Sequence, residues 1–308
     1  MNKVSVIIPN TNSPLIGRII QALKSQNVDA SVFEVLVVGT DQPGLVTVDD
    51  QVRLIPTREG VHASDKRNLG MKEASGEIFA FIDDDCVPYP DWLELHLARH
   101  AQGELVVGGS ITFGRSNYLQ LADNVSAFHD LLPFTPPGER TYLCTSNLSV
   151  NRRVVQHVGE MMAQKSRAED LEWTVRFRRR GYRLYFEPQA KIFHDPRRCD
   201  LMSVWRHWTD DAPHTLAVRL RYASWLHTPA LAKHRWIYLW GALAVSAWAT
   251  ARSFTHPQTI WKYWHTLPMV YLTKIAWCWG AYSYHPSTTS LSGSSGPGLF
   301  SERYKGNL

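Results

Sequence analysis

The sequence predicts an α/β fold, in which a mostly parallel β-sheet lies between helices, followed by a helical region. Two observations lead to this prediction. Over residues 1–199, short runs of β-branched and aromatic residues alternate with segments of helical periodicity, which is typical of a parallel sheet with crossover helices. Beyond residue 200, the apolar runs become longer and richer in tryptophan. The chain of 308 residues is long enough to bury a sizeable core.

The elements of the first part are predicted in order. A strand at residues 4–8 precedes an amphipathic helix at 14–25, and the helix has Leu15, Ile19, Ile20 and Leu23 on one face. Further strands are expected at residues 34–38, 52–55, 78–82, 105–108 and 143–150, with short pieces at 183–186 and 191–193. Helices are expected at residues 62–74, 90–100 and 169–180. Residues 113–140 contain several prolines and are expected to be irregular.

The charge distribution places a boundary near residue 200. Residues 1–199 carry 23 Lys and Arg against 24 Asp and Glu, whereas residues 200–308 carry 10 against four and hold ten of the twelve Trp. We therefore expect an α/β domain at 1–199, a basic helical region at 200–285 and a flexible Ser/Gly-rich tail at 286–308. The four Cys form no Cys-x-x-Cys pair, so the sequence suggests neither a zinc site nor a disulfide framework, and a reducing compartment fits.

The basic region favours contact with an anionic membrane surface rather than with nucleic acid, because Trp prefers the headgroup level and Lys and Arg reach toward anionic headgroups. Three pairs recur at helical spacing: Trp205/Trp208, Trp236/Trp240 and Trp261/Trp264. The longest uncharged apolar stretch, residues 236–251, has sixteen residues, short of the roughly 20 that a spanning helix needs. We expect helices lying in the interface, with a short inserted segment as an alternative. A soluble helical domain or a dimer interface with a Trp-rich core is the other interpretation.

The most informative motif is a hydrophobic run, residues 78–82, that ends in Asp83, Asp84 and Asp85. In an open α/β sheet, ligands bind just beyond the carboxyl ends of such strands. Three adjacent carboxylates repel one another unless a cation neutralises them, which predicts a metal site. The alternative is a loop that caps the next helix, although one Asp would suffice for that.

Polar residues elsewhere fit a nucleotide site. Pro9, Asn10 and Asn12 follow the first strand, where they could hold a nucleotide or simply form a strand-to-helix turn. Lys66 and Arg67 could offset the charge of a diphosphate, or could lie on a solvated helix face.

Two later features fit catalysis. Glu169 and Asp170 begin a predicted helix, where acids are favoured by the helix dipole but could also serve as a general base. His194 ends a strand-like run and could ligate a metal or contact a phosphate, or could be structural.

In their order and spacing, these motifs resemble the family 2 glycosyltransferases with the GT-A fold, of the inverting, membrane-associated bacterial type. The resemblance covers about residues 3–196. It rests on VSVIIPN at 4–10, RNLG at 67–70, ASGEI at 74–78, FIDDD at 81–85, GG at 108–109, SNLSV at 146–150, EDLE at 169–172, GYRLYFEP at 181–188 and His194.

The resemblance implies a nucleotide-sugar donor (a UDP- or GDP-sugar) and a divalent cation, Mg²⁺ or Mn²⁺. It assigns Asp85 and His194 to the metal, and Asp170 to the catalytic base with Glu169 beside it. Asp83 is expected to contact the donor ribose or sugar, and Asp84 to be the least essential of the three. The full set expected to contact the donor is Pro9, Asn10, Asn12, Asp41, Lys66, Arg67, Asp83 and Asp84.

One departure concerns the nucleotide base. Gly39 stands where the family often has an Asp that contacts the base, so Asp41 is expected to substitute from two residues later. The motifs therefore indicate the family more directly than they indicate which nucleotide the donor carries.

The resemblance and the Trp-rich region together predict an inverting, metal-dependent glycosyltransferase of the hexosyltransferase type at the cytoplasmic face of the plasma (inner) membrane. The expected acceptor is a lipid-linked or other glycan in envelope or exopolysaccharide synthesis. No nucleic acid partner is expected, and a homo-oligomer is left open. The alternatives are a nucleotidyltransferase on the same fold, which would release pyrophosphate, and a non-catalytic membrane-bound partner subunit, which the departure at Gly39 favours.

Overall fold

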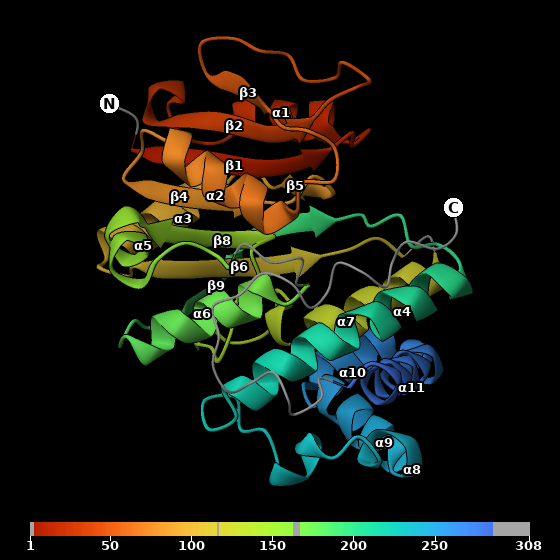
Figure 1. Ribbon diagram of the computed structural model, residues 1–308. Coiled ribbons are helices and arrows are strands. Elements are labelled where there is room, and N and C mark those ends of the chain that lie inside the picture. The colour runs from red at the N-terminus through yellow and green to blue at the C-terminus, as the bar shows by residue number, and fades with distance from the viewer. Residues whose placement is uncertain (1–2, 116, 163–166, 286–308) are drawn as a thin grey trace.

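The computed structural model describes residues 3–115, 117–162 and 167–285. Its centre is a single sheet with the strand order β3-β2-β1-β4-β8-β6-β9-β5, and β7 pairs with β9 (Figure 1). The strands are β1 (Val4–Thr11), β2 (Phe33–Thr40), β3 (Val52–Pro56), β4 (Ile78–Ile82), β5 (Cys86–Pro88), β6 (Val106–Thr112), β7 (Gly138–Glu139), β8 (Asn147–Asn151) and β9 (Tyr185–His194). The predicted α/β fold class is confirmed.

The sheet has a parallel half and a mixed half. Strands β3, β2, β1 and β4 are parallel to one another, whereas β8 runs antiparallel to both β4 and β6. Because β8 is reversed, its first residue, Asn147, pairs with Ile82 at the end of β4. The segment before β8 therefore lies at the carboxyl end of β4, where Asp83–Asp85 also lie. The two short strands expected at residues 183–186 and 191–193 form one strand, β9, and its parallel pairing with β6 shifts register between Gly109 and Ser110.

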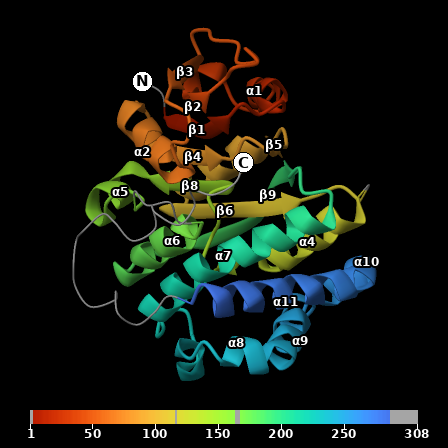
Figure 2. The ribbon, with the colours of Figure 1, turned by 45° about the vertical axis from the view of Figure 1, so that its right-hand side comes forward.

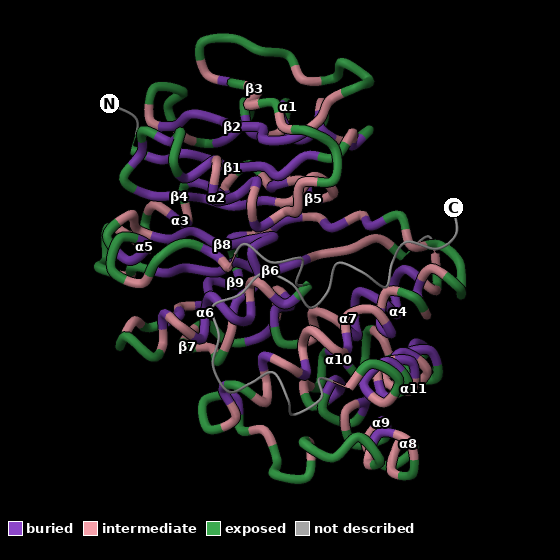
Figure 3. The backbone as a smooth tube through the Cα atoms, in the orientation of Figure 1, coloured by how far each residue is buried: buried purple, intermediate pink, exposed green. Residues whose placement is uncertain are grey.

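Helices cover both faces of the sheet. They are α1 (Ile16–Lys24), α2 (Ala63–Glu73), α3 (Trp92–Ala101), α5 (Arg152–Val158) and α6 (Glu169–Arg179). Figure 2 shows α1 and α2 on opposite faces. The amphipathic pattern of α1 is observed as burial of Ile16, Ile19, Ile20 and Leu23. The strands between these helices are buried almost throughout, as the purple tube of Figure 3 shows.

The expectation that residues 113–140 are irregular is wrong for α4 (Tyr118–Phe128). Asn117 begins this helix by accepting a hydrogen bond from the backbone N–H of Gln120. The helix was not recognisable from hydrophobic periodicity because its buried positions include the polar residues Gln120, Asp123, Asn124 and Ser126. Figure 1 shows α4 among the helices below the sheet.

The second part of the chain forms the helices α7 (Leu201–Arg221), α8 (Ile237–Trp240), α9 (Ala242–Ser253), α10 (Pro257–Tyr263) and α11 (Leu267–Ser283). Short 3₁₀ turns lie at Ala30–Val32, His129–Leu131, Ala230–Lys233 and Trp264–Thr266. Helix α11 packs against α7, α9 and α4. One apolar cluster combines Leu121 and Val125 of α4 with Val204 and Trp208 of α7 and Val270 of α11. Helix α4 therefore belongs to the core of the C-terminal helices although it precedes them by about 70 residues.

The longest apolar stretch, residues 236–251, is not one helix. It is divided at Gly241 into α8 and α9. A Cβ at Gly241 would lie 2.6 Å from the carbonyl oxygen of Ile237, so the close turn requires a glycine. In the described part of the chain, no helix has the length and apolar character needed to cross a membrane. The tail predicted at residues 286–308 lies outside the described residues.

Candidate active site

The three consecutive aspartates lie at the carboxyl end of β4, and each has a different partner. Asp83 pairs with the guanidinium of Arg67 on α2. Asp84 accepts a hydrogen bond of 2.8 Å from the backbone N–H of Thr11, at the end of β1. Asp85 lies 3.5 Å from Nε2 of His194, the last residue of β9. The sheet thus separates three carboxylates that are adjacent in sequence and gives each its own contact.

Asp85 and His194 form a pair suited to a divalent cation. Burial alone would raise the pKa of Asp85, but the His194 imidazole and the Cys86 thiol lower it to about 2, so the carboxylate is ionised at neutral pH. The Nδ1 atom of His194 lies 2.6 Å from Oδ1 of Asn124, which leaves Nε2 directed toward Asp85. An ionised carboxylate oxygen and an imidazole nitrogen that face the same point fit Mn²⁺ or Mg²⁺.

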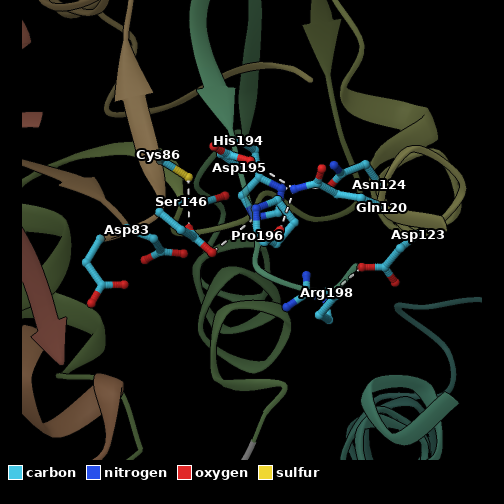
Figure 4. Close-up of polar contacts among 12 residues, drawn as sticks. Asp83, Cys86, Gln120, Asp123, Asn124, Ser146, His194, Asp195, Pro196 and Arg198 are labelled. Carbon is cyan, nitrogen blue, oxygen red and sulfur yellow. Dashed lines mark hydrogen bonds and ion pairs between the residues drawn. The ribbon is translucent and has the colours of Figure 1, made fainter. Parts of the chain in front are cut away.

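Cys86 lies beside this pair and was not predicted from the sequence. Its Sγ and the ligand atoms of Asp85 and His194 lie within 4.8 Å of one another. Figure 4 shows Cys86 and His194 in this group. Burial raises the pKa of the Cys86 thiol well above its ordinary value, so the thiol is protonated and donates a hydrogen bond of 3.4 Å to Asp85 Oδ1. A protonated thiol is a poor metal ligand, and Cys86 therefore orients Asp85 rather than completing the ligand set.

A cavity of about 260 Å³ opens beside Asp84 and Asp85, and Thr11, Ser13 and Arg197 also line it. Arg197 is exposed and follows β9 by three residues. Sequence reasoning missed this residue, although the pair Arg197-Arg198 directly after the His194 motif was a signal that could have found it. A cavity with carboxylates on its floor and a guanidinium beside them suits a diphosphate that is bound partly through a cation.

The residues at the end of β1 form a turn beside this cavity, which Thr11 and Ser13 line. Asn10 donates from Nδ2 to the Thr40 carbonyl and accepts from the Ser13 backbone N–H. Asn12 has a left-handed backbone, with φ of 54°, and accepts from the Gln42 N–H. These contacts are those of a strand-to-helix turn. Pro9 is buried within β1, and contacts from Pro9, Asn10 and Asn12 to a donor stay predictions.

Gly39 leaves no space for a side chain. Its φ is 144°, and a Cβ would lie 1.9 Å from the carbonyl oxygen of Asn10 on the paired strand β1. The Asp41 carboxylate accepts hydrogen bonds from the backbone N–H groups of Leu45 and Val46, at 3.1 and 2.8 Å. It therefore closes its own loop, and its proposed contact with a base stays a prediction.

Two cations of α2 lie under the site. Lys66 donates 2.7 Å hydrogen bonds to the Asn10 carbonyl and to Thr11 Oγ1. The side chain of Arg67 is only 4% exposed and bridges Asp83 and Glu169, with 3.1 Å between its Nη1 and Glu169 Oε1. Although burial opposes its charge, these carboxylates raise the pKa of Arg67, so it stays cationic. Arg67 therefore joins the end of β4 to the start of α6, and its contact with a diphosphate stays a prediction.

Glu169 and Asp170 at the start of α6 have different environments. Glu169 pairs with Arg67, while its Oε2 is buried with no hydrogen-bond partner among the described residues. Asp170 accepts a hydrogen bond of 2.6 Å from the Leu171 N–H. Burial and the neighbouring Glu169 raise the pKa of Asp170 to about 7. A carboxylate with this pKa can accept a proton at neutral pH, as a general base must.

The sequence of this chain is similar to that of known glycosyltransferases. The model of the family "Glycosyl transferase family 2" matches residues 5–159, and the chain belongs to this family. Glycosyltransferase AglE of Haloferax volcanii is 32% identical over 193 residues, which are 59% of this chain and 64% of AglE, so the match spans less than two thirds of that relative.

Two solved structures share the fold. Mannosyltransferase PcManGT from Pyrobaculum calidifontis, solved in complex with GDP-Man and Mn²⁺, has a TM-score of 0.62 at 18% identity, over 92% of this chain and 88% of that one. TarS from S. aureus has a TM-score of 0.51 at 16% identity, over 91% of this chain and 55% of that one. These likenesses support the GT-A fold predicted from the sequence motifs.

Proposed function

We propose that the protein transfers a sugar from a nucleoside diphosphate donor to an acceptor hydroxyl in a single inverting displacement. The observation that carries this proposal is the Arg67 bridge, which links Asp83 of the cation-binding edge to Glu169, next to the candidate base Asp170. A cation and a base close to one another are what such a displacement requires, because the leaving diphosphate gains charge while the acceptor loses a proton.

Each side chain has one task in this reaction. Asp85 and His194 hold the divalent cation, which when bound offsets the charge of the leaving diphosphate. Arg197 and Lys66 add positive charge beside and below the cavity. Asp170 accepts the proton of the acceptor hydroxyl, and Arg67 keeps Asp83 and Glu169 in place. Because PcManGT was solved with GDP-Man and Mn²⁺, GDP-hexoses and UDP-hexoses with Mn²⁺ or Mg²⁺ are the first donors to test.

A screen of nucleotide sugars tests this function. We expect release of free nucleoside diphosphate from one donor in the presence of Mn²⁺ or Mg²⁺, and loss of this release when EDTA is added. Release of pyrophosphate instead would identify a nucleotidyltransferase. If calorimetry detects no cation-dependent binding of nucleoside diphosphates, the non-catalytic partner subunit is supported. The anomeric configuration of the product, read by NMR, tests inversion.

We also propose that the C-terminal helices bind an anionic membrane surface and that the acceptor is a lipid-linked glycan, at the cytoplasmic face of the plasma (inner) membrane. Five exposed tryptophans support membrane binding, and Trp240 and Trp261 are 82% and 84% exposed. They lie on α8, α9, α10 and the turns beside them: Trp236, Trp240, Trp248, Trp261 and Trp264, named here the tryptophan set. So much exposed indole is unusual for a monomer in water.

The positive charge of the C-terminal helices also supports binding to an anionic membrane. No Asp or Glu occurs between Asp211 and Glu302 in the sequence, and Lys233, Arg235, Arg252 and Lys262 lie near the tryptophan set. Arg235 and Arg252 stack on Trp236 and Trp248 respectively. The pair Trp205/Trp208 behaves differently, because Trp208 is buried and donates to Asp123. A bilayer with anionic headgroups matches this combination of indole rings and positive charge.

Vesicle sedimentation tests the membrane proposal. We expect the protein to sediment with phosphatidylglycerol-containing vesicles and much less with phosphatidylcholine alone. The double variant Trp240→Ser/Trp261→Ser should bind at least about tenfold more weakly, because two large apolar side chains no longer enter the interface. Val48→Ser is the matched control, since Val48 is 58% exposed in the loop before β3, outside the helical region.

Three outcomes would contradict the membrane proposal. Wild type could fail to sediment with anionic vesicles, or the Trp variant could bind as well as wild type. A wild-type dimer that becomes a monomer in the Trp variant, measured by ultracentrifugation without lipid, would instead support a Trp-rich dimer interface.

A further inference from the structure

Three side chains of α4 hold the segment that follows β9. Gln120 donates from Nε2 to Asp195 Oδ1, at 2.9 Å, and to the Pro196 carbonyl. Asn124 contacts His194 at 2.6 Å, and Asp123 Oδ2 accepts a hydrogen bond of 2.7 Å from Arg198 Nε. Figure 4 shows these side chains of α4 directed toward residues 194–198. Helix α4, which was not predicted from the sequence, therefore holds the chain around the candidate cation site in place.

The contact with Asn124 determines which nitrogen of His194 carries a proton. The amide Oδ1 of Asn124 is an acceptor, so Nδ1 of His194 must be the donor. The Nε2 atom, which lies 3.5 Å from Asp85 Oδ2, then either donates a proton to Asp85 or presents its lone pair to a cation.

The position of Asn124 is itself fixed. Its side chain is buried, with the residue 1% exposed. Its neighbour Asp123 is fully buried and accepts hydrogen bonds from Trp208 Nε1 and His207 Nδ1 on α7, at 2.7 and 3.1 Å, in addition to Arg198. Although burial opposes ionisation, His207 and Arg198 keep the pKa of Asp123 well below its ordinary value. An ionised and fully paired Asp123 holds this turn of α4 against α7.

We propose that Asn124 is a positioning residue of the cation site, which holds His194 with its proton on Nδ1 so that Nε2 is free to bind the metal. This inference rests on the proposed metal-dependent function. Hydrogen-bond partners of a metal-ligating histidine commonly change metal affinity by about 10- to 100-fold when removed.

The test is Mn²⁺ binding to the whole protein, measured by the EPR signal of free Mn²⁺. Asn124→Leu keeps the approximate shape but cannot accept a hydrogen bond, so we expect binding about 10- to 100-fold weaker than in wild type. Asn124→Asp keeps an acceptor and should retain binding. Ser126→Ala is the matched control, because Ser126 is a buried polar residue of α4 that hydrogen-bonds to Thr273 rather than to His194.

A double-mutant cycle separates positioning from a general loss of structure. Asn124→Leu should have no further effect in a His194→Ala background, because it acts only through that imidazole. Equal weakening in both backgrounds, or wild-type affinity in Asn124→Leu, would overturn the role of Asn124. If His194→Ala weakens binding but Asn124→Leu does not, only this inference fails. If wild type binds no Mn²⁺, the proposed metal dependence fails with it.

Discussion

Replacing Asp170 with asparagine should lower the rate of sugar transfer by about 10²- to 10⁴-fold, the usual contribution of a general base. The amide keeps the shape of the carboxylate and can still accept the hydrogen bond from the Leu171 N–H, but it cannot take a proton from the acceptor. The measurement is the initial rate of nucleoside diphosphate release with the donor found by the screen. Glu160→Gln is the control, because Glu160 is an exposed carboxylate that pairs with Lys72 outside the site.

The pH dependence follows from the same residue. Burial and Glu169 raise the pKa of Asp170 to about 7, and only the deprotonated form acts as a base. At saturating Mn²⁺, the wild-type rate should therefore fall about tenfold per pH unit below pH 7 and become constant above it. The residual rate of Asp170→Asn should lack this dependence. A wild-type rate that does not change between pH 5.5 and 8 would remove Asp170 as the base.

Stability provides an independent check that Asp170→Asn is folded. A raised pKa means that the folded state disfavours the ionised carboxylate, so this residue destabilises the protein once the pH exceeds the ordinary pKa of Asp, about 3.9. The penalty grows up to about pH 7. Asp170→Asn should therefore melt at a higher temperature than wild type at pH 8, and the difference should vanish toward pH 4. A variant that is inactive and less stable at pH 8 would contradict this account.

Replacing Asp85 with asparagine should abolish detectable Mn²⁺ binding in calorimetry and lower transfer by roughly 10³-fold, since a catalytic cation supplies several kcal/mol of charge stabilisation. Asp85 is the carboxylate that faces His194 and whose pKa is lowered to about 2, so its charge is present at every working pH. An asparagine there offers a neutral oxygen of much lower affinity for a hard cation.

Asp84→Asn is the matched comparison, because the two residues are adjacent and undergo the same chemical change. The amide oxygen at position 84 can still accept the hydrogen bond from the Thr11 N–H. We expect Mn²⁺ binding to be retained and transfer to fall only a few-fold. Equal losses in the two variants would show that the triplet acts as a single charge rather than through Asp85.

The sequence predicted the parallel half of the sheet well because each strand there is a short apolar run with polar residues at its ends. Strand β4 begins and ends at the predicted residues, 78 and 82, since Gly76 and the aspartates bound it sharply. In contrast, α4 was missed because its buried positions are polar, and periodicity detects only apolar faces.

Some pairings in the candidate site could not be predicted because they join residues that are far apart in the sequence. The resemblance to a family predicted Asp85 and His194 together, but no spacing rule connects Arg67 with Glu169, 102 residues away, or His194 with Asn124, 70 residues away. These pairings depend on which elements lie side by side in the sheet. Strand β8, which is antiparallel, lies between β4 and β6, so the order of strands in the sheet differs from their order in the sequence. The role of Asn124 therefore emerged only from the structure.

Helix α4 has a consequence for how the protein responds to its ligands. Its apolar side lies in the core of the C-terminal helices, and its polar side holds His194. If contact with lipid changes the order of α4, thermodynamic reciprocity requires that cation binding change the affinity for lipid by the same factor. If lipid instead orders α4 in the arrangement that holds His194, lipid and cation would each strengthen the binding of the other, without any separate regulatory site.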